Sequence, residues 1–326
     1  MIYHLAQLEH HGNVMTQTIW CYTSDENYIF PTLVSASQAK RQLKNSEDQV
    51  VIMCFGISDQ IFLNVREVAN SENILLIRVS KDILRGLPMY CARLFIYDII
   101  ASPASDLIYL DGDTQILSNL RALSEIKPKP GSLLAVPDLM ALAIASSTPL
   151  GVKRSEYFHK LGLSADLQLR YFNSGVLKAN MSDWKMISED CVKFIMNNDM
   201  NNFHFLDQDV LNIISQGRHE LLSIRWNCPA FFLRRGLDDL IDPVVLHFMS
   251  RPRPWEGGFL PWGLSGHVPY QQFIEAHPQL ADFYRPFRGM KKLRYHIQQC
   301  SKAVMEDWGN ETMRARIREF EKMAVI

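Results

Sequence analysis

The 326-residue chain is predicted to fold as an α/β protein with a buried, mostly parallel sheet flanked by helices. Through the first half, short and continuously apolar runs alternate with segments whose apolar residues recur at helical spacing. Apolar residues make up 47% and charged residues 21% of the chain, which is typical of a globular protein with a proper core.

The elements follow from these patterns in chain order. In the first half, apolar runs predict strands over 17–23, 49–56, 74–79 and 106–111. Helical spacing predicts helices over 30–43, 59–70 and 87–100, and Pro31 is tolerated in a first turn. In the second half, strands are expected over 132–139, 170–180 and 243–249. Helices are expected over 182–198, with Ser182 as the N-cap, and over 206–216.

The composition changes at residue 251, where a stretch rich in Pro, Gly and Trp begins. It is too long and aromatic for a simple connection, so we expect it to be functional. Beyond it the pattern is helical to the end. We therefore predict one α/β domain over 15–250, followed over 251–326 by this loop and a helical tail.

The charge balance excludes some classes of protein. Lys and Arg number 34 against 35 Asp and Glu, a net charge of −1, so we expect neither a disordered chain nor a nucleic-acid binder. The six cysteines form no CxxC pair and suit a reduced, cytoplasmic protein. Residues 1–14 lack the basic-then-apolar pattern of a signal peptide, and no apolar run is long enough to predict a membrane span.

The clearest chemical signal is the pair Asp111 and Asp113 in "YLDGD", directly after an apolar strand. Ligands bind at the carboxyl ends of strands in such sheets. Two carboxylates at this spacing can share a divalent cation, Mn²⁺ or Mg²⁺, that holds a diphosphate. Taken alone, the pair fits a polar turn equally well.

Phosphatases of the haloacid-dehalogenase type also carry two aspartates after an apolar strand. Their pattern places Thr or Val two residues after the second aspartate, a position that Gln115 occupies here. Their motif also usually opens the fold, whereas three predicted strands precede Asp111. Both departures argue against this chemistry.

Five further segments stand in the order of one family: "SDENY" with Asp25, Asn27 and Tyr28, "MYCARLFIYD" with Arg93, "YFNSGV" with Asn173, "LDQDVLN" with Asp207 and Gln208, and "HFMSRPRPW" with His247. With "YLDGD" they span about residues 17–255. The chain thereby resembles the retaining family-8 glycosyltransferases, which include bacterial lipopolysaccharide hexosyltransferases and glycogenin-like proteins.

The resemblance implies a GT-A-type fold and a UDP-sugar donor whose diphosphate is bound through a divalent cation, Mn²⁺ or alternatively Mg²⁺. It implies Asp111, Asp113 and His247 as metal ligands, with Gly112 beside the nucleotide. The family's diphosphate-binding Lys is Arg253 here, which keeps the charge, and its Gly is Ser250, which restricts how closely a backbone amide approaches the phosphate.

The same resemblance implies roles for the remaining residues. Asp25, Asn27 and Tyr28 would hold the nucleoside, although "SDEN" also suits a helix-capping turn. Three residues would act in catalysis: Gln208, Asp207 and Arg93. Asp138 and Asn173 would contact sugar hydroxyls, and Asp209 would be a structural carboxylate at a helix start. For the mechanism of retaining transfer, front-side attack and double displacement are both compatible with these residues.

The loop Trp255–His267 is expected to contact the acceptor sugar. Phe259 and Trp262 would offer flat faces to sugar rings, and Gly257 and Gly258 would permit lid movement.

The basic segment 285–296 would dock on anionic lipid at the inner membrane face, or be a solvated helix face. Alternatives are a glycogenin-like protein glucosyltransferase, a metal-dependent phosphatase and an inactive nucleotide-sugar binder. The donor epimer, acceptor, linkage and oligomeric state stay open.

Overall fold

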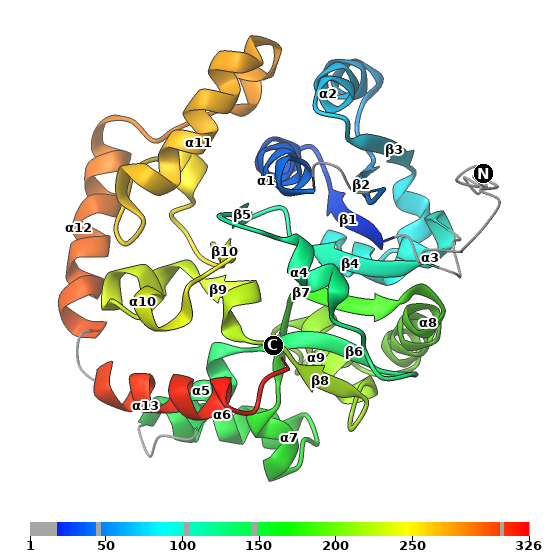
Figure 1. Ribbon diagram of the computed structural model, residues 1–326, viewed down its shortest axis with the longest axis vertical. Coiled ribbons are helices and arrows are strands. Elements are labelled where there is room, and N and C mark those ends of the chain that lie inside the picture. The colour runs from blue at the N-terminus through cyan, green and yellow to red at the C-terminus, as the bar shows by residue number, and fades with distance from the viewer. Residues whose placement is uncertain (1–17, 44–46, 101–104, 145–148, 307–309, 326) are drawn as a thin grey trace.

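A computed structural model describes residues 18–43, 47–100, 105–144, 149–306 and 310–325, and the prediction for residues 1–14 lies outside them. A seven-stranded sheet runs through the centre of the molecule (Figure 1). In spatial order its strands are β3 Leu75–Val79, β2 Gln49–Phe55, β1 Thr18–Ser24, β4 Asp106–Leu110, β7 Phe172–Asn180, β6 Leu133–Pro137 and β8 His219–Leu221.

The sheet is mixed and mostly parallel, which confirms the predicted fold class. The pairings β3–β2, β2–β1, β1–β4 and β6–β8 are parallel, and only β7 runs antiparallel, to both of its neighbours. Parallel neighbours need crossover connections, and helices supply them between β1, β2 and β3. These are α1 Ile29–Gln42 and α2 Asp59–Ser71, close to their predicted ranges.

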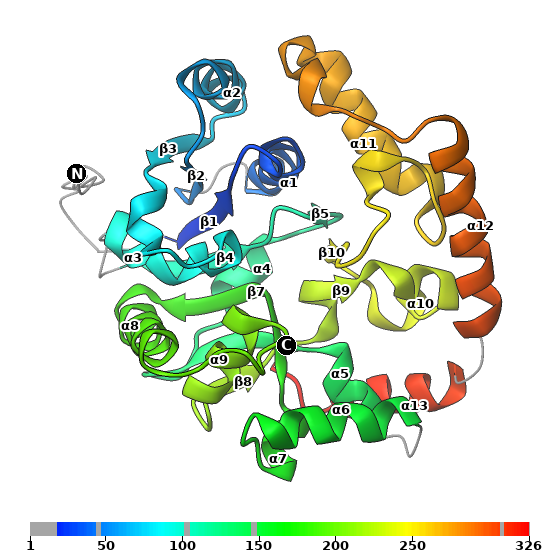
Figure 2. The ribbon, with the colours of Figure 1, turned by 180° about the vertical axis from the view of Figure 1, so that it is seen from behind.

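The two faces of the sheet bury two separate cores, because side chains alternate along each strand. Trp20 and Tyr22 of β1 pack into a core with α1 and α2, whereas Ile19 and Cys21 pack into a core on the opposite face. Figure 2 shows α8 Met181–Asn197 and α9 Leu206–Ile214 on that second side.

The remaining α-helices are α3 Ile96–Ile99, α4 Arg121–Glu125, α5 Leu139–Ile144, α6 Pro149–Lys160, α7 Ala165–Leu169, α10 Asp238–Ile241, α11 Gly263–Ala276, α12 Gly289–Glu306 and α13 Asn310–Glu321.

A smaller sheet of three strands lies beside the first: β5 Thr114–Ile116, β10 Val245–His247 and β9 Cys228–Pro229. The strand expected over 243–249 is thus three residues long and pairs outside the main sheet. β10 runs antiparallel to β5 and places His247 opposite Thr114. A residue near the end of the predicted α/β domain therefore lies next to the turn that follows β4.

The C-terminal part packs onto the rest of the chain. Phe273, Ile317 and Phe320 are buried in the same core as α1, and the backbone N–H of Val325 donates to the Leu221 carbonyl at 2.9 Å. Residues before and after the predicted boundary at 250 therefore pack into one hydrophobic core. The division into a catalytic part and an extension stays a prediction.

Two local predictions are wrong. The N-cap of α8 is Asn180 rather than Ser182, and the Asn180 side chain accepts a hydrogen bond from the Ser182 backbone N–H. The helix expected over 87–100 is a 3₁₀ helix, Met89–Phe95, followed by the short α3. Arg93 lies in this 3₁₀ helix and is buried.

Across the described residues, none of the helices combines the length and the apolar character needed to cross a lipid bilayer.

Candidate functional site

The ends of four strands gather the predicted polar residues at one edge of the main sheet. Asp25, Asp111 and Asp138 follow the carboxyl ends of β1, β4 and β6. Because β7 is antiparallel, its first residues lie at this same edge, and Asp111 donates its backbone N–H to the Gly175 carbonyl at 2.8 Å. The pairing of β6 with β7 is irregular here, and residues 174–176 form a bulge.

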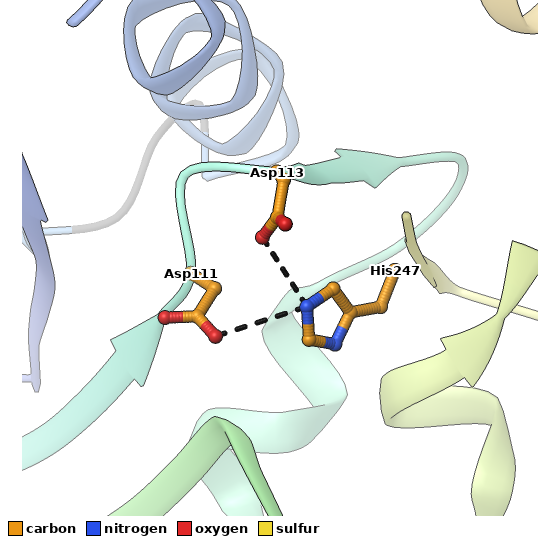
Figure 3. A group of neighbouring side chains, drawn as sticks. All are labelled: Asp111, Asp113 and His247. Carbon is orange, nitrogen blue, oxygen red and sulfur yellow. Dashed lines mark ion pairs between the residues drawn. The ribbon is translucent and has the colours of Figure 1, made fainter. Parts of the chain in front are cut away.

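Asp111, Asp113 and His247 form one group of possible metal ligands (Figure 3). One donor atom from each lies within 4.8 Å of the others. His247 Nε2 is 3.2 Å from Asp113 Oδ1 and 3.7 Å from Asp111 Oδ2. Burial by itself raises the pKa of Asp113, yet His247 and Arg253 beside it hold that pKa well below its ordinary value.

The orientation of His247 suits metal binding. Its Nδ1 lies 2.9 Å from Asn227 Oδ1, an acceptor, so Nδ1 can donate a hydrogen bond there and leave Nε2 directed at the carboxylates as a metal ligand. Asn227 in turn donates to Asn173 Oδ1 at 2.8 Å. Two carboxylates and a neutral imidazole held this way fit Mn²⁺, and Mg²⁺ less well because it prefers oxygen ligands.

Gly175 provides the space that His247 occupies. A Cβ at residue 175 would lie 2.3 Å from His247 Cε1 and 2.7 Å from Nδ1. Neither contact is possible without displacing the imidazole.

We therefore expect Gly175→Ala to weaken Mn²⁺ binding about 10- to 100-fold, the range typical of lost support for a metal ligand. Calorimetric titration of Mn²⁺ would measure it. Gly162→Ala is the control for a strained backbone away from the site, since φ is +78° there but nothing lies within 4 Å of a Cβ. Equal Mn²⁺ affinity in Gly175→Ala and the unaltered protein would contradict this placement of His247.

Arg93 connects the metal-ligand group to the predicted sugar site. Its guanidinium lies 3.0 Å from Asp111 Oδ1 and 3.1 Å from Asp207 Oδ2, and it also donates to the Ser174 carbonyl. Burial alone would lower the pKa of Arg93, but Asp111 and the other anionic groups around it raise it. Arg93 is therefore a permanent cation between two carboxylates.

Asp207 is a buried carboxylate with an unusual pKa. Burial raises its pKa to about 6, although Arg93 opposes this shift. The folded chain binds this proton more tightly than the unfolded chain does. The resulting stabilisation is fully present below about pH 4 and is lost as the pH rises through 6, by about 3 kcal/mol for a two-unit shift.

In metal-free protein we expect the free energy of unfolding to fall from pH 4 to pH 7, relative to Asp207→Asn. Urea denaturation in the presence of a chelator would measure both proteins across this range. Parallel curves for the two would show that Asp207 titrates normally.

A cavity of about 360 Å³ lies on one side of the metal-ligand group, lined by Asp25, Asn27, Tyr28, Gly112 and Tyr90 among others. Asp25 also accepts backbone hydrogen bonds from Asn27 and Tyr28, at 3.0 and 3.3 Å, so it stabilises the turn before α1 as well. Gly112 lies against α1, where a Cβ would be 2.1 Å from Thr32 Oγ1.

Arg253, in the loop after β10, contacts two residues that line this cavity. Its Nη1 lies 2.5 Å from Asp113 Oδ2, and its Nη2 donates to the Tyr28 hydroxyl at 3.1 Å. The structure thus brings a cation next to the candidate metal ligands. Ser250, in contrast, is exposed.

A second cavity, of about 550 Å³, shares Tyr90, Arg93, Asp111 and Asp113 with the first. Asp138, Asn173 and Gln208 line it and bond to one another. Asp138 Oδ2 accepts from Asn173 at 3.0 Å and from Gln208 at 3.2 Å. The Gln208 carbonyl oxygen accepts from the Ser174 backbone and from Asn173, both at 3.1 Å, so its amide is held in one orientation.

Asp209 lies behind this network and is fully buried. It accepts from the hydroxyls of Tyr157 and Tyr171, both at 2.5 Å, and from the Phe205 backbone N–H at 2.9 Å. Tyr171 in turn accepts from Gln208 at 3.1 Å. Asp209 thus makes the helix-start contact predicted for it.

The prediction that Phe259 and Trp262 of the 255–267 loop form an aromatic surface for the acceptor is wrong. Phe259 is 0% and Trp262 6% exposed, because both belong to the core shared with α1. Gly257 is needed for this packing, since a Cβ there would lie 2.7 Å from Phe259 Cε2. The lid role of Gly257 and Gly258 stays a prediction.

Several residues of the site were not singled out from the sequence. Asn227 and the role of Gly175 depend on contacts with His247 that no local pattern signals. Tyr90 lies within the Arg93 segment, and only the structure shows that its ring is exposed at the cavities. The second cavity adds further residues: Leu139, Met140, Arg154, His204, Phe205 and Met249.

Comparison with known proteins identifies the family. The model described as glycosyl transferase family 8 matches residues 20–257, more than half of the chain. A lipopolysaccharide 1,2-glucosyltransferase of Escherichia coli is 20% identical over 290 residues, covering 78% of this chain and 80% of that protein.

Solved structures agree on the fold. The galactosyltransferase LgtC, in complex with donor and acceptor sugar analogs, superposes with a TM-score of 0.62 at 21% identity, covering 79% of this chain and 96% of LgtC. The bifunctional glycosyltransferase WbbM gives a TM-score of 0.65 at 17% identity over 84% of this chain, which spans only 52% of WbbM. These likenesses confirm the predicted GT-A-type fold.

Proposed function

The chain belongs to glycosyl transferase family 8, and on that premise we propose that it transfers glucose or galactose from a UDP-sugar to a glycan acceptor with retention. One observation carries this proposal: Asp111, Asp113 and His247 lie where two cavities meet. The smaller cavity suits a nucleoside and the larger a sugar with its acceptor. The Escherichia coli relative, a lipopolysaccharide glucosyltransferase, supports lipopolysaccharide or another surface polysaccharide as acceptor.

A divalent cation bound by Asp111, Asp113 and His247 would supply positive charge for the departing diphosphate. Arg253 would contribute a second positive charge, turning its guanidinium from Asp113 toward a phosphate. Asp25 and Asn27 would hydrogen-bond the uridine, and Tyr28 would stack on its base. Ser250 stays a candidate for the diphosphate through its backbone.

The environment of Gln208 favours front-side attack. Its carbonyl oxygen already accepts two hydrogen bonds, and its amide group donates to Asp138 and Tyr171. Attack by this oxygen on the anomeric carbon would require breaking that network. We infer instead that Gln208 stabilises positive charge on the sugar ring while the leaving phosphate takes the acceptor's proton.

The experiment is to measure UDP release from UDP-glucose and UDP-galactose with Mn²⁺, and to assign the configuration of the product by NMR. Metal-dependent release with retained configuration supports the proposal. Release with inversion contradicts it. A mass increase of the protein on incubation with donor alone would favour the glycogenin-like alternative, and hydrolysis of p-nitrophenyl phosphate would favour a phosphatase. If UDP binds without any turnover, the chain is an inactive binder.

We further propose that α12 binds anionic membrane lipid. The basic side chains Lys291, Lys292 and Arg294 are exposed on it, as are the apolar Met290, Leu293 and Ile297, and Arg288 is exposed directly before it. Exposed apolar side chains among cations suit insertion at a lipid headgroup surface. Phe287 and Tyr295, in contrast, stack on each other and pack against the core.

The protein is expected to co-sediment with phosphatidylglycerol vesicles at low salt but not with phosphatidylcholine vesicles. The double variant Lys292→Glu/Arg294→Glu should lose this binding. A matched variant on α8, Lys185→Glu/Lys193→Glu, should keep it. Equal loss in both variants would point to net charge alone rather than to α12.

A further inference from the structure

The second cavity contains a cation that none of the predicted roles uses. Arg154, on α6, lines this cavity and is half-buried. Within the part of the chain that the structure describes, its guanidinium makes no hydrogen bond and no ion pair. Residues 145–148, just before α6, are Ala, Ser, Ser and Thr and so include no acidic side chain.

The acidic side chains of the cavity are already engaged elsewhere. Asp111 and Asp207 lie against Arg93, and Asp113 against Arg253. Asp138 accepts hydrogen bonds from Asn173, Gln208 and the Met140 backbone. Arg154 therefore faces the cavity without a counter-charge from the described residues. Guanidinium groups bind phosphate and carboxylate through paired hydrogen bonds, so such a cation is suited to an anionic ligand.

The neighbouring wall suits a sugar ring. Phe205 is 44% exposed and lines the same cavity as Arg154. His204 also lines it, and its ring is stacked on Tyr157 with centroids 4.7 Å apart. Phe205 thus offers the aromatic surface that Phe259 and Trp262 do not, since those two are buried.

We propose that the acceptor sugar carries a negatively charged group, a phosphate monoester or a carboxylate, that binds Arg154. This inference rests on the proposed transferase function. The donor half of the site would hold UDP on the Tyr28 side of the metal ligands. The acceptor would enter the second cavity with its ring on Phe205 and its anion on Arg154. The selected acceptors are then acidic glycans, and neutral sugars are poor ones.

The test measures binding of three simple sugars to protein saturated with UDP and Mn²⁺: glucose, glucose 6-phosphate and glucuronic acid. Arg154→Gln removes the charge. Lys153→Gln removes an exposed neighbouring charge that does not line the cavity. We expect at least one charged sugar to bind more tightly than glucose, and Arg154→Gln to weaken its binding about 10-fold or more. Lys153→Gln should have no effect, and glucose binding should be equal in all three proteins.

The outcomes separate this inference from the proposed function. If UDP fails to bind with Mn²⁺, the transferase proposal itself fails. If UDP binds but neither charged sugar is preferred, or both variants lose affinity equally, only the assignment of Arg154 is overturned. Preference for the phosphate or for the carboxylate identifies the anion. Unchanged melting temperatures and UDP affinity in both variants would show that the fold and the donor site are intact.

Discussion

Replacing Asp113 with Asn is expected to abolish metal-dependent UDP binding and to lower kcat/KM for sugar transfer by about 10²–10³-fold or more. Asp113 contacts both His247 and Arg253. The amide is similar in size but neutral, so it binds a divalent cation poorly and no longer attracts Arg253. The loss should fall on the charge that develops on the diphosphate in the transition state.

Calorimetric titration of UDP into metal-free protein, with and without Mn²⁺, measures the binding part of this prediction. Asp242→Asn is the matched control, because Asp242 is an exposed residue paired with Arg225 that lines neither cavity. The variant and the control should differ only when Mn²⁺ is present. UDP binding that is unaffected by both Mn²⁺ and Asp113→Asn would require another donor or another way of holding the diphosphate.

Replacing Arg93 should produce the largest combined loss of stability and activity. Removing its charge in Arg93→Met leaves Asp111 and Asp207 without their shared cation. An uncompensated buried charge costs about 3–5 kcal/mol of unfolding free energy. Arg93→Lys keeps the charge, but one ammonium group cannot contact Asp111, Asp207 and the Ser174 carbonyl in the same geometry. We expect about a 10²-fold lower kcat/KM for Arg93→Lys.

Urea denaturation of metal-free protein and steady-state kinetics separate these two effects. The double variant Arg93→Met/Asp207→Asn should recover part of the stability lost in Arg93→Met, since it removes one of the two carboxylates, but none of the activity. Arg121→Met is the control, because the exposed Arg121–Glu125 pair should contribute less than about 0.5 kcal/mol. If the double variant is no more stable than Arg93→Met, Asp207 does not depend on Arg93 for its charge.

Much of the site could be predicted because its residues follow recognisable segments. Asp111 and Asp113 come directly after an apolar strand, and parallel strands bring their carboxyl ends to one edge of the sheet. The structure indeed places Asp25, Asp111 and Asp138 there. The stretch with Asn173 also arrives at this edge, although β7 runs in the opposite direction to β4. Its residues reach the site through the beginning of the strand, not its end.

Aromatic residues of the 255–267 loop show where such reasoning fails. The residue types alone are compatible with sugar binding and with a core, and only packing distinguishes the two. Phe259 lies against Tyr295 and His296 of α12, and Trp262 lies against Phe248. These contacts join the loop to the C-terminal helices, so its aromatic rings are removed from solvent.

The sequence by itself determined the α/β class, the order of β1 to β4 with α1 and α2 between the first three, and the acidic turn after β4, because apolar periodicity and turn residues act over a few neighbouring positions. Tertiary structure alone decided that β10 pairs with β5, so that His247 meets Asp113 from more than a hundred residues away. It also decided that Asn227 orients His247, that Gly175 leaves room for it, and that Arg154 lines the second cavity. Those contacts depend on the packing of the whole chain, since no local preference selects a partner at such sequence separation.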